Sequence, residues 1–295
     1  MKNIENILEV LKKIQEKRKN PILFLQLETI DIASLLKTHK LLHRKAFNTL
    51  DVILNTPGGD IDAAFQYTKI LRKKSKKINI LVPLFSKSAG TLMCLCGDKI
   101  FLTDLSELGP LDTQIQESQE GDVPSYSSAL NGFKALEQVQ RHSLETLDIA
   151  AKLIYNRSKL KMSEAVHLAI EFSGQTVGTL YGKLNPLKIG EYARALEIGE
   201  KYGIMILTDY MNWDFKRAQD TIKKLVYDYP SHAFVIDFKE LQSIGLPAEE
   251  VGTDIEEHMF ELRDVIINVI KSRNTIIHLI EQENRENNHK KNKRN

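Results

Sequence analysis

The stretch LDVILNTPGGDIDAAFQYTKILRKKSKK, residues 50–77, decides the fold expected for this chain. It begins as an apolar strand, turns at NTPGGD, and continues with helical periodicity from about Asp60 to Lys74. Further strand-like runs are PILFLQLE upstream and INILVPL and DKIFLT downstream, with the apolar run SAGTLMCLCG between the last two as a buried helix. Strands that alternate with helices over residues 21–103 predict an α/β fold whose parallel sheet has crossover connections.

The second half of the chain has helical periodicity from about residue 127 onward. The expected organisation is an N-terminal helix at 1–20, a main domain at 21–250 with a helical insertion at about 127–225, a C-terminal helical segment at 251–283 that could break near 272–274, and a disordered polar tail at 284–295.

The overall composition excludes some classes of protein. Lys and Arg number 41 against 39 Asp and Glu, so no general affinity for polyanions follows, and nucleic-acid binding is not indicated. We find neither a signal-peptide pattern nor an uncharged apolar run long enough to span a membrane, so the sequence predicts a cytoplasmic protein. Cys94 and Cys96 are too close within a helix to form a disulfide, which indicates buried thiols.

Two turns from strand to helix carry the residues of chemical interest. In the first, Gly58 and Gly59 permit backbone conformations and close approaches that a side chain would block, and N–H groups at the following helix start can receive an anion. In the second, Ser88 falls in the first turn of its helix beside the Ala89 N–H, as either an N-cap or a nucleophile. Because the turns follow consecutive strands, we expect them side by side at the carboxyl edge of the sheet.

NTPGGD, then SAGTL about thirty residues on, then GDKIFLTDLSELGPLDTQI, together resemble the Clp-protease and crotonase superfamily, and most of all the serine dehydrogenase proteinase family. The resemblance covers residues 21–116, and weaker matches return at YPSHAFVIDFKELQSIGL, residues 229–246, and at GEYARALEIGEKYG. It implies a Clp/crotonase-like spiral of ββα units, a serine peptidase activity without metal or other cofactor, a peptide or protein substrate, and assembly into a homo-oligomer.

The resemblance also implies a triad in the chain order Ser88, Asp112, His232, with an oxyanion hole formed by the backbone N–H groups of Gly58 or Gly59 and of Ala89. Ser88 matches the serine of the family's SAG motif. Asp112 falls where Clp-type peptidases carry their histidine, and His232 falls close to where they carry their aspartate, so base and orienting group exchange places.

The residues themselves leave alternatives open. His232 lies in a loop punctuated by proline, where sites are often carried, but an exposed loop histidine has the same pattern. His39 and His43 lie one helical turn apart without further metal ligands nearby, which favours a solvated helix face. Asp112 follows Gly109-Pro110 and could simply cap the next segment. Asp98 and Asp104 are the other aspartates considered.

A serine–lysine dyad is a second way to activate the serine, as in signal-peptide-peptidase-like relatives of the superfamily. Lys134 or Lys152 could supply the base if buried with a lowered pKa. Lys87 is expected to project away from the serine beside it, and Ser86 is the weaker candidate nucleophile. Two rival functions also remain: a crotonase-like protein that acts on thioesters, and a catalytically silent scaffolding protein that works through its helical half.

Overall fold

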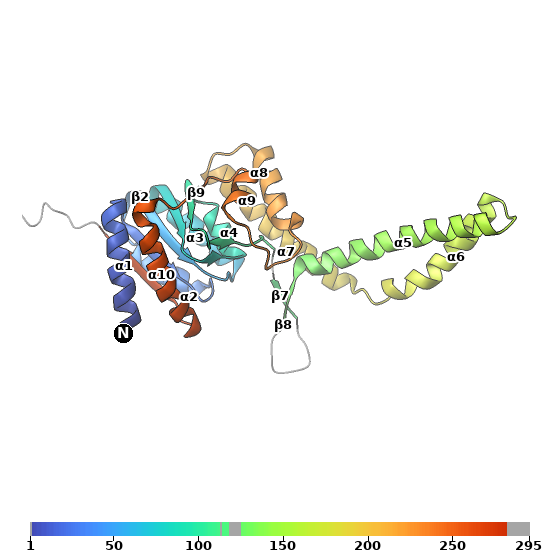
Figure 1. The fold of residues 1–295 in the computed structure, drawn as a ribbon, viewed down its shortest axis with the longest axis horizontal. Helices are drawn as coiled ribbons and strands as arrows, with labels where there is room; N and C mark the ends of the chain where they lie inside the picture. Colours follow the sequence, from blue (N-terminus) through green and yellow to red (C-terminus); the bar gives the residue numbers. More distant parts are fainter. Residues whose placement is uncertain (1, 113, 118–124, 282–295) are drawn as a thin grey trace, which may run out of the picture. The chain divides into compact units, whose positions relative to one another are not determined.

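The computed structural model describes residues 2–112, 114–117 and 125–281, and it divides the chain into two compact units. The first unit comprises residues 1–111 and 199–295, and the second comprises residues 112–198. The polar tail expected at 284–295 lies outside the described residues. Figure 1 gives the ribbon of both units with the labels used below.

A six-stranded sheet in the order β10-β1-β2-β3-β5-β9 forms the centre of the first unit. Its strands are β1 (Ile22–Gln26), β2 (Phe47–Asn55), β3 (Ser75–Val82), β5 (Lys99–Leu102), β9 (Ala248–Glu250) and β10 (Ile276–Ile280). Every neighbouring pair is parallel except β1 with β10. The expected α/β fold with a mostly parallel sheet and a helical second half is therefore confirmed.

The helices of the first unit follow from local sequence signals. They are α1 (Lys2–Arg18), α2 (Ile32–Leu41), α3 (Ile61–Lys74), α4 (Ala89–Cys94), the end of α7 (Pro186–Met205), η1 (Ile206–Tyr210), α8 (Phe215–Lys223), η2 (Lys224–Asp228), α9 (Phe238–Ser243) and α10 (Thr253–Lys271). Asp60, which ends the NTPGGD turn, caps α3 by accepting the Ala63 N–H at 2.8 Å. This side-chain cap satisfies one backbone donor that the helix leaves open, and it fixes where the helix begins.

Both faces of the sheet are covered. Phe24, Ile53, Leu81 and Phe101 stand in one row across the central strands and pack with the apolar faces of α1 and α10. Figure 1 shows these two helices side by side. The residues that alternate with this row, such as Val52 and Ile80, point to the opposite face and are also buried. Burial on both faces explains why the strands read as continuous apolar runs.

The predicted helical segment at 251–283 is wrong for the residues beyond 274. α10 ends at Lys271, Arg273 has a positive φ of 51°, and Ile276–Ile280 form β10, antiparallel to β1. The run IIHLI is rich in β-branched side chains, which fit a pleated surface. Pairing with β10 also removes the exposed edge that β1 would otherwise present.

The second unit consists of a small antiparallel pair, β7 (Gln114–Glu117) with β8 (Ser125–Ser128), and the long helices α5 (Ala129–Arg157) and α6 (Met162–Tyr181). The first part of α7 follows. Within the described residues, no helix has the length and apolar character needed to cross a membrane.

Candidate active site

The NTPGGD turn has a conformation that requires its glycines. Gly58 and Gly59 have φ values of 117° and 145°, a region in which residues with a side chain are strained. A Cβ placed on Gly59 would also lie 2.4 Å from the carbonyl oxygen of Ile30. The segment around Ile30 holds the glycine turn in place, because Ile30 N donates to Gly58 O and Asp60 N donates to Ile30 O, each at 2.8 Å.

Ser88 occupies the second turn in a strained conformation. Its φ of 51° and ψ of −119° lie outside the regions that residues with a side chain commonly adopt. It is the first residue before α4, yet its side chain makes no capping hydrogen bond to that helix. Strain at a sharp strand-to-helix turn is the local geometry of a nucleophile elbow, and an ordinary N-cap serine does not require it.

The two turns lie against each other, as their positions after neighbouring strands predict. A Cβ on Gly58 would stand 3.0 Å from Lys87 O, 3.1 Å from Ser88 Cβ and 3.5 Å from Ala89 N. Thr56 joins the turns by donating its N–H to Phe85 O and accepting the Lys87 N–H, each at 3.0 Å. The backbone of the glycine turn therefore forms one wall beside the Ser88 side chain and the start of α4.

Thr91, within α4, forms hydrogen bonds that hold the Ser88 turn and the segment at Gly109 together. Its hydroxyl oxygen lies 2.9 Å from Ser86 O and 2.7 Å from Gly109 O, and it accepts the Gly109 N–H at 3.2 Å. Thr91 and Ser86 are both fully buried. The buried Ser86 side chain packs beside Cys94, with 3.5 Å between Ser86 Oγ and Cys94 Sγ, which is consistent with Ser86 as the weaker candidate nucleophile.

Gly90 is needed at the same corner for its lack of a side chain. A Cβ there would lie 2.5 Å from Thr56 Cγ2 and 2.6 Å from Ser86 Oγ. The glycine of the SAG motif thus allows α4 to begin directly against the residue that joins the two turns.

The Lys87 side chain contacts β6 (Glu107–Leu108) and the segment at Phe234, and so links both to the turn before α4. Its Nζ lies 2.7 Å from a carboxylate oxygen of Glu107 and donates to Leu108 O and Phe234 O at 3.3 and 3.4 Å. This agrees with the expectation that Lys87 projects away from the serine beside it. The lysine instead connects the Ser88 turn to the loop that carries His232.

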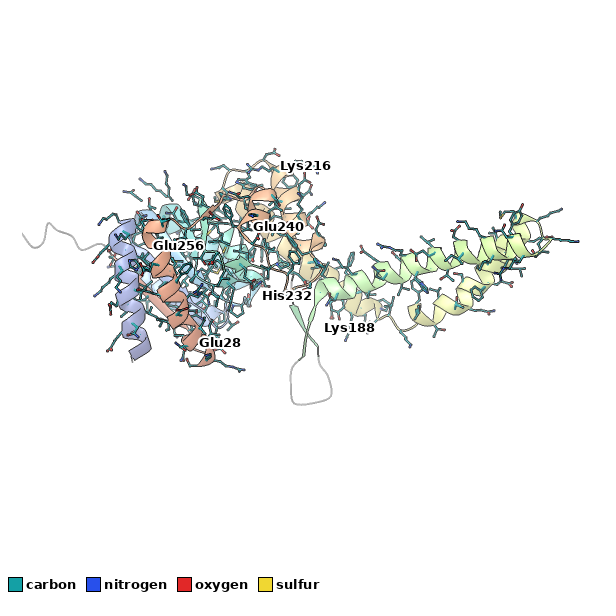
Figure 2. All side chains as sticks on the ribbon, viewed as in Figure 1. Glu28, Lys188, Lys216, His232, Glu240 and Glu256 are labelled. Atoms are coloured by element: carbon teal, nitrogen blue, oxygen red, sulfur yellow. The ribbon has the colours of Figure 1, made fainter. Side chains whose placement is uncertain are left out.

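His232 belongs to the same unit as Ser88 and is partly exposed in a turn before α9, where Figure 2 labels it. Four residues on, Ile236 forms an antiparallel bridge with Leu108 of β6 (Glu107–Leu108). β6 in turn pairs with β4 (Phe85–Ser86), which ends two residues before Ser88. The His232 loop is therefore attached to the segments that precede and support the Ser88 turn.

Asp112 and the two candidate lysines belong to the second unit. Asp112 is buried, and its Oδ1 accepts the Leu130 N–H at 3.3 Å at the start of α5, so it acts as a helix cap at least in part. Lys134 lies one turn further along α5 and is partly buried. Lys152 is exposed and forms an ion pair with Asp148 at 2.6 Å.

The two cysteines are free and buried, as expected. Burial raises the pKa of Cys94 and the pKa of Cys96 to about 12, so both remain thiols at neutral pH. His39 and His43 have ring centroids 6.4 Å apart. No group of three or more His, Cys, Asp or Glu in the described parts of the chain could hold a metal ion.

The structure thus shows an α/β protein with a mostly parallel sheet, in which a serine in a strained conformation and a glycine turn lie side by side after neighbouring strands. Residues 21–166 match the family model of ClpP-like SDH-type serine proteinases. The resemblance expected from NTPGGD and SAGTL is thus confirmed.

Two uncharacterized proteins of Methanocaldococcus jannaschii are similar to this chain. One is 25% identical over 77% of this chain and 62% of its own length, and the other is 23% identical over 73% of this chain and 56% of its own length. The chain thus spans less than two thirds of either relative. Among solved structures, a membrane-bound stomatin-specific protease aligns with a TM-score of 0.30 and 16% identity, over 49% of this chain and 66% of that one.

Proposed function

We propose that this protein is a serine peptidase with Ser88 as its nucleophile. The single observation that carries the proposal is the strained Ser88 turn packed against the glycine turn, in a chain that matches the model of a serine proteinase family. A merely structural serine would not require backbone strain, which persists only where the surroundings impose it.

The proposed reaction is acyl transfer. Ser88 Oγ attacks the carbonyl carbon of a peptide while a neighbouring base takes its proton. Backbone N–H groups of Gly58 or Gly59 and of Ala89 receive the oxyanion, since the glycine turn lies beside Ser88 and the start of α4. The base then returns the proton to the leaving amine, and water hydrolyses the acyl-enzyme.

His232 is the proposed base, with Asp112 as its orienting carboxylate. In support, the His232 loop is held to the nucleophile turn through Lys87 and through the bridge between Leu108 and Ile236. Lys134 is the second candidate base, because it is partly buried near the start of α5 whereas Lys152 is exposed and paired.

Hydrolysis of a fluorogenic peptide mixture by single variants tests this proposal. Ser88→Ala should abolish turnover, and the variant that removes the true base, His232→Ala or Lys134→Met, should lower it by about 10²–10⁴-fold. Lys152→Met is the matched control for the lysine and should keep full activity. Undiminished hydrolysis by Ser88→Ala overturns the proposal, and loss in Lys134→Met with full activity in His232→Ala replaces the triad by a dyad.

The same variants separate the rival enzyme class. A crotonase-like protein would use the glycine turn and the Ala89 N–H on a thioester without a serine nucleophile. Ser88→Ala would then keep its activity toward an acyl-CoA. We expect no such activity.

A further inference from the structure

A cavity of about 640 Å³ lies in the first unit, at the edge of the sheet where β2 and β3 begin. Phe47, the first residue of β2, pairs in register with Ser75, the first residue of β3, and both residues line the cavity. The Ser88 turn follows the other end of β3, and eight residues of strand place the two ends roughly 25 Å apart. The cavity is therefore separate from the candidate active site.

The lining of this cavity is rich in basic side chains. Four cations and one carboxylate belong to its described lining, namely Arg72, Lys73, Lys74, Lys76 and Asp209. The first three lie in the last turn of α3, where basic residues also balance the helix dipole. The dipole does not account for Lys76, which lies in β3. An anion in the cavity would therefore meet an excess of positive charge.

Two buried side chains of the lining have a polar atom without a partner. Among the described residues, Arg72 Nε and Ser75 Oγ are buried and make no hydrogen bond. The Arg72 side chain is 9% exposed, and Ser75 is 6% exposed. An unsatisfied buried polar group costs free energy, so such groups are rare in folded proteins. A ligand in the cavity that accepts a hydrogen bond from both side chains would remove this cost.

The guanidinium of Arg72 is held in place by its other two nitrogens. Nη1 donates to Asp98 Oδ2 at 3.0 Å, and Nη2 contacts Met211 Sδ. Asp98 is itself fixed, because the same oxygen accepts the Ile78 N–H at 2.7 Å. Arg72 Nε therefore has a fixed position before a ligand arrives, which lowers the entropy lost on binding.

A phosphate group matches these donors. Its several oxygens can accept hydrogen bonds from a hydroxyl, a guanidinium N–H and a lysine ammonium at the same time. The cavity is larger than a phosphate group and lies within the range of about 300–1,000 Å³ that is typical of small-molecule sites. Phe47 and Tyr210 also line it and are partly buried, so they offer aromatic surface to the rest of a phosphorylated molecule.

We propose that this cavity binds a phosphate group, either as free phosphate or as part of a small molecule such as a nucleotide. Arg72 Nε and Ser75 Oγ donate to the phosphate oxygens, and Lys76 with the lysines at the end of α3 neutralises the charge. Ser88 takes no part, so the proposal does not depend on the peptidase activity.

Isothermal titration calorimetry of the full chain at constant ionic strength tests the proposal. The probes are inorganic phosphate, AMP and adenosine. We expect phosphate or AMP to bind, and adenosine to bind at least about tenfold more weakly than AMP, because it lacks the charged acceptor. Tighter binding of AMP than of phosphate identifies a phosphorylated small molecule as the ligand, and the reverse order identifies free phosphate.

Two neighbouring lysines of β3 provide a matched pair of variants. Lys76→Met should weaken binding at least about fivefold. Lys77 is also exposed, but it points to the other face of the strand and does not line the cavity. Lys77→Met makes the same change in net charge and should keep the wild-type affinity to within about twofold.

Ser75→Ala separates binding from folding. It removes a buried hydroxyl that has no partner, so the melting temperature should stay the same or rise. The affinity for the phosphate probe should nevertheless fall at least about tenfold, the loss expected for a hydrogen bond to a charged group.

Three outcomes overturn the proposal: no binding of either phosphate or AMP, adenosine binding as tightly as AMP, or equal effects of Lys76→Met and Lys77→Met. An unchanged affinity in Ser75→Ala also overturns it. Tighter binding of a single-stranded RNA, weakened equally by both lysine variants, would assign the basic surface to nucleic acid and overturns the proposal as well.

Discussion

Gly58 lies against Ser88, because a Cβ built on that glycine would stand 3.1 Å from Ser88 Cβ and 3.0 Å from Lys87 O. Two turns that are thirty residues apart in the sequence thus share one corner of the molecule. The glycine turn therefore lies directly beside the side chain of Ser88.

Substituting Gly58 should damage catalysis more than folding. Gly58→Ala keeps the backbone N–H but adds a methyl group at a positive φ, 3.1 Å from Ser88 Cβ, so the turn has to shift away from Ser88. If the N–H is displaced from the oxyanion, we expect peptide turnover to fall by about 10²–10³-fold. Gly59→Ala is the comparison, since its Cβ would lie 2.4 Å from a backbone oxygen of Ile30 and should mainly lower the melting temperature. Thermal melts and turnover of both variants check this, and wild-type turnover by Gly58→Ala contradicts it.

Removing the Thr91 hydroxyl should destabilise the corner. Thr91→Val keeps the shape of the side chain but leaves the buried N–H and C=O of Gly109 without this partner. We expect the free energy of unfolding in urea to fall by about 1–3 kcal/mol. Thr91→Ser retains the hydroxyl and should lose less. Equal losses in the two variants would show that the methyl group, and not the hydrogen bonds, matters.

The buried thiols should make stability decline at alkaline pH. Burial raises the pKa of Cys94 and Cys96 to about 12 from an unfolded value near 9, so above pH 9 the unfolded chain loses protons that the native chain keeps. The free energy of unfolding should therefore fall as pH rises from 9 toward 12. Urea titrations of the wild type and of Cys94→Ala/Cys96→Ala between pH 8 and 10.5 measure this. The wild type should show the steeper decline, and identical slopes contradict the assignment.

Much of the fold could be predicted because local patterns and tertiary structure agree. The strands from PILFLQLE to DKIFLT are buried on both faces, and Asp60 and the glycine turn mark the start of α3 as the sequence indicates. The segment at 276–280 could not be assigned the same way. Its apolar residues continue the helical periodicity of α10, so the local pattern favours a helix. Pairing with β1, which lies far earlier in the sequence, makes the segment a strand.

The site was predictable to a different extent. Ser88 and the glycine turn stand in recognisable motifs, and the structure brings them together. No sequence pattern pointed to Thr91, because its hydrogen bonds depend on Gly109, which comes close only in the folded chain. The identity of the base stays a prediction, because His232 lies in a loop of one unit while Asp112 and Lys134 belong to the other.

Labelling with a fluorophosphonate, followed by mass spectrometry of the modified peptide, tests the central claim most directly. We predict a single stoichiometric adduct on Ser88 in the folded chain, with no adduct after denaturation or in Ser88→Ala. A wild-type chain that stays unlabelled while correctly folded, or that carries its adduct on another residue, contradicts the account.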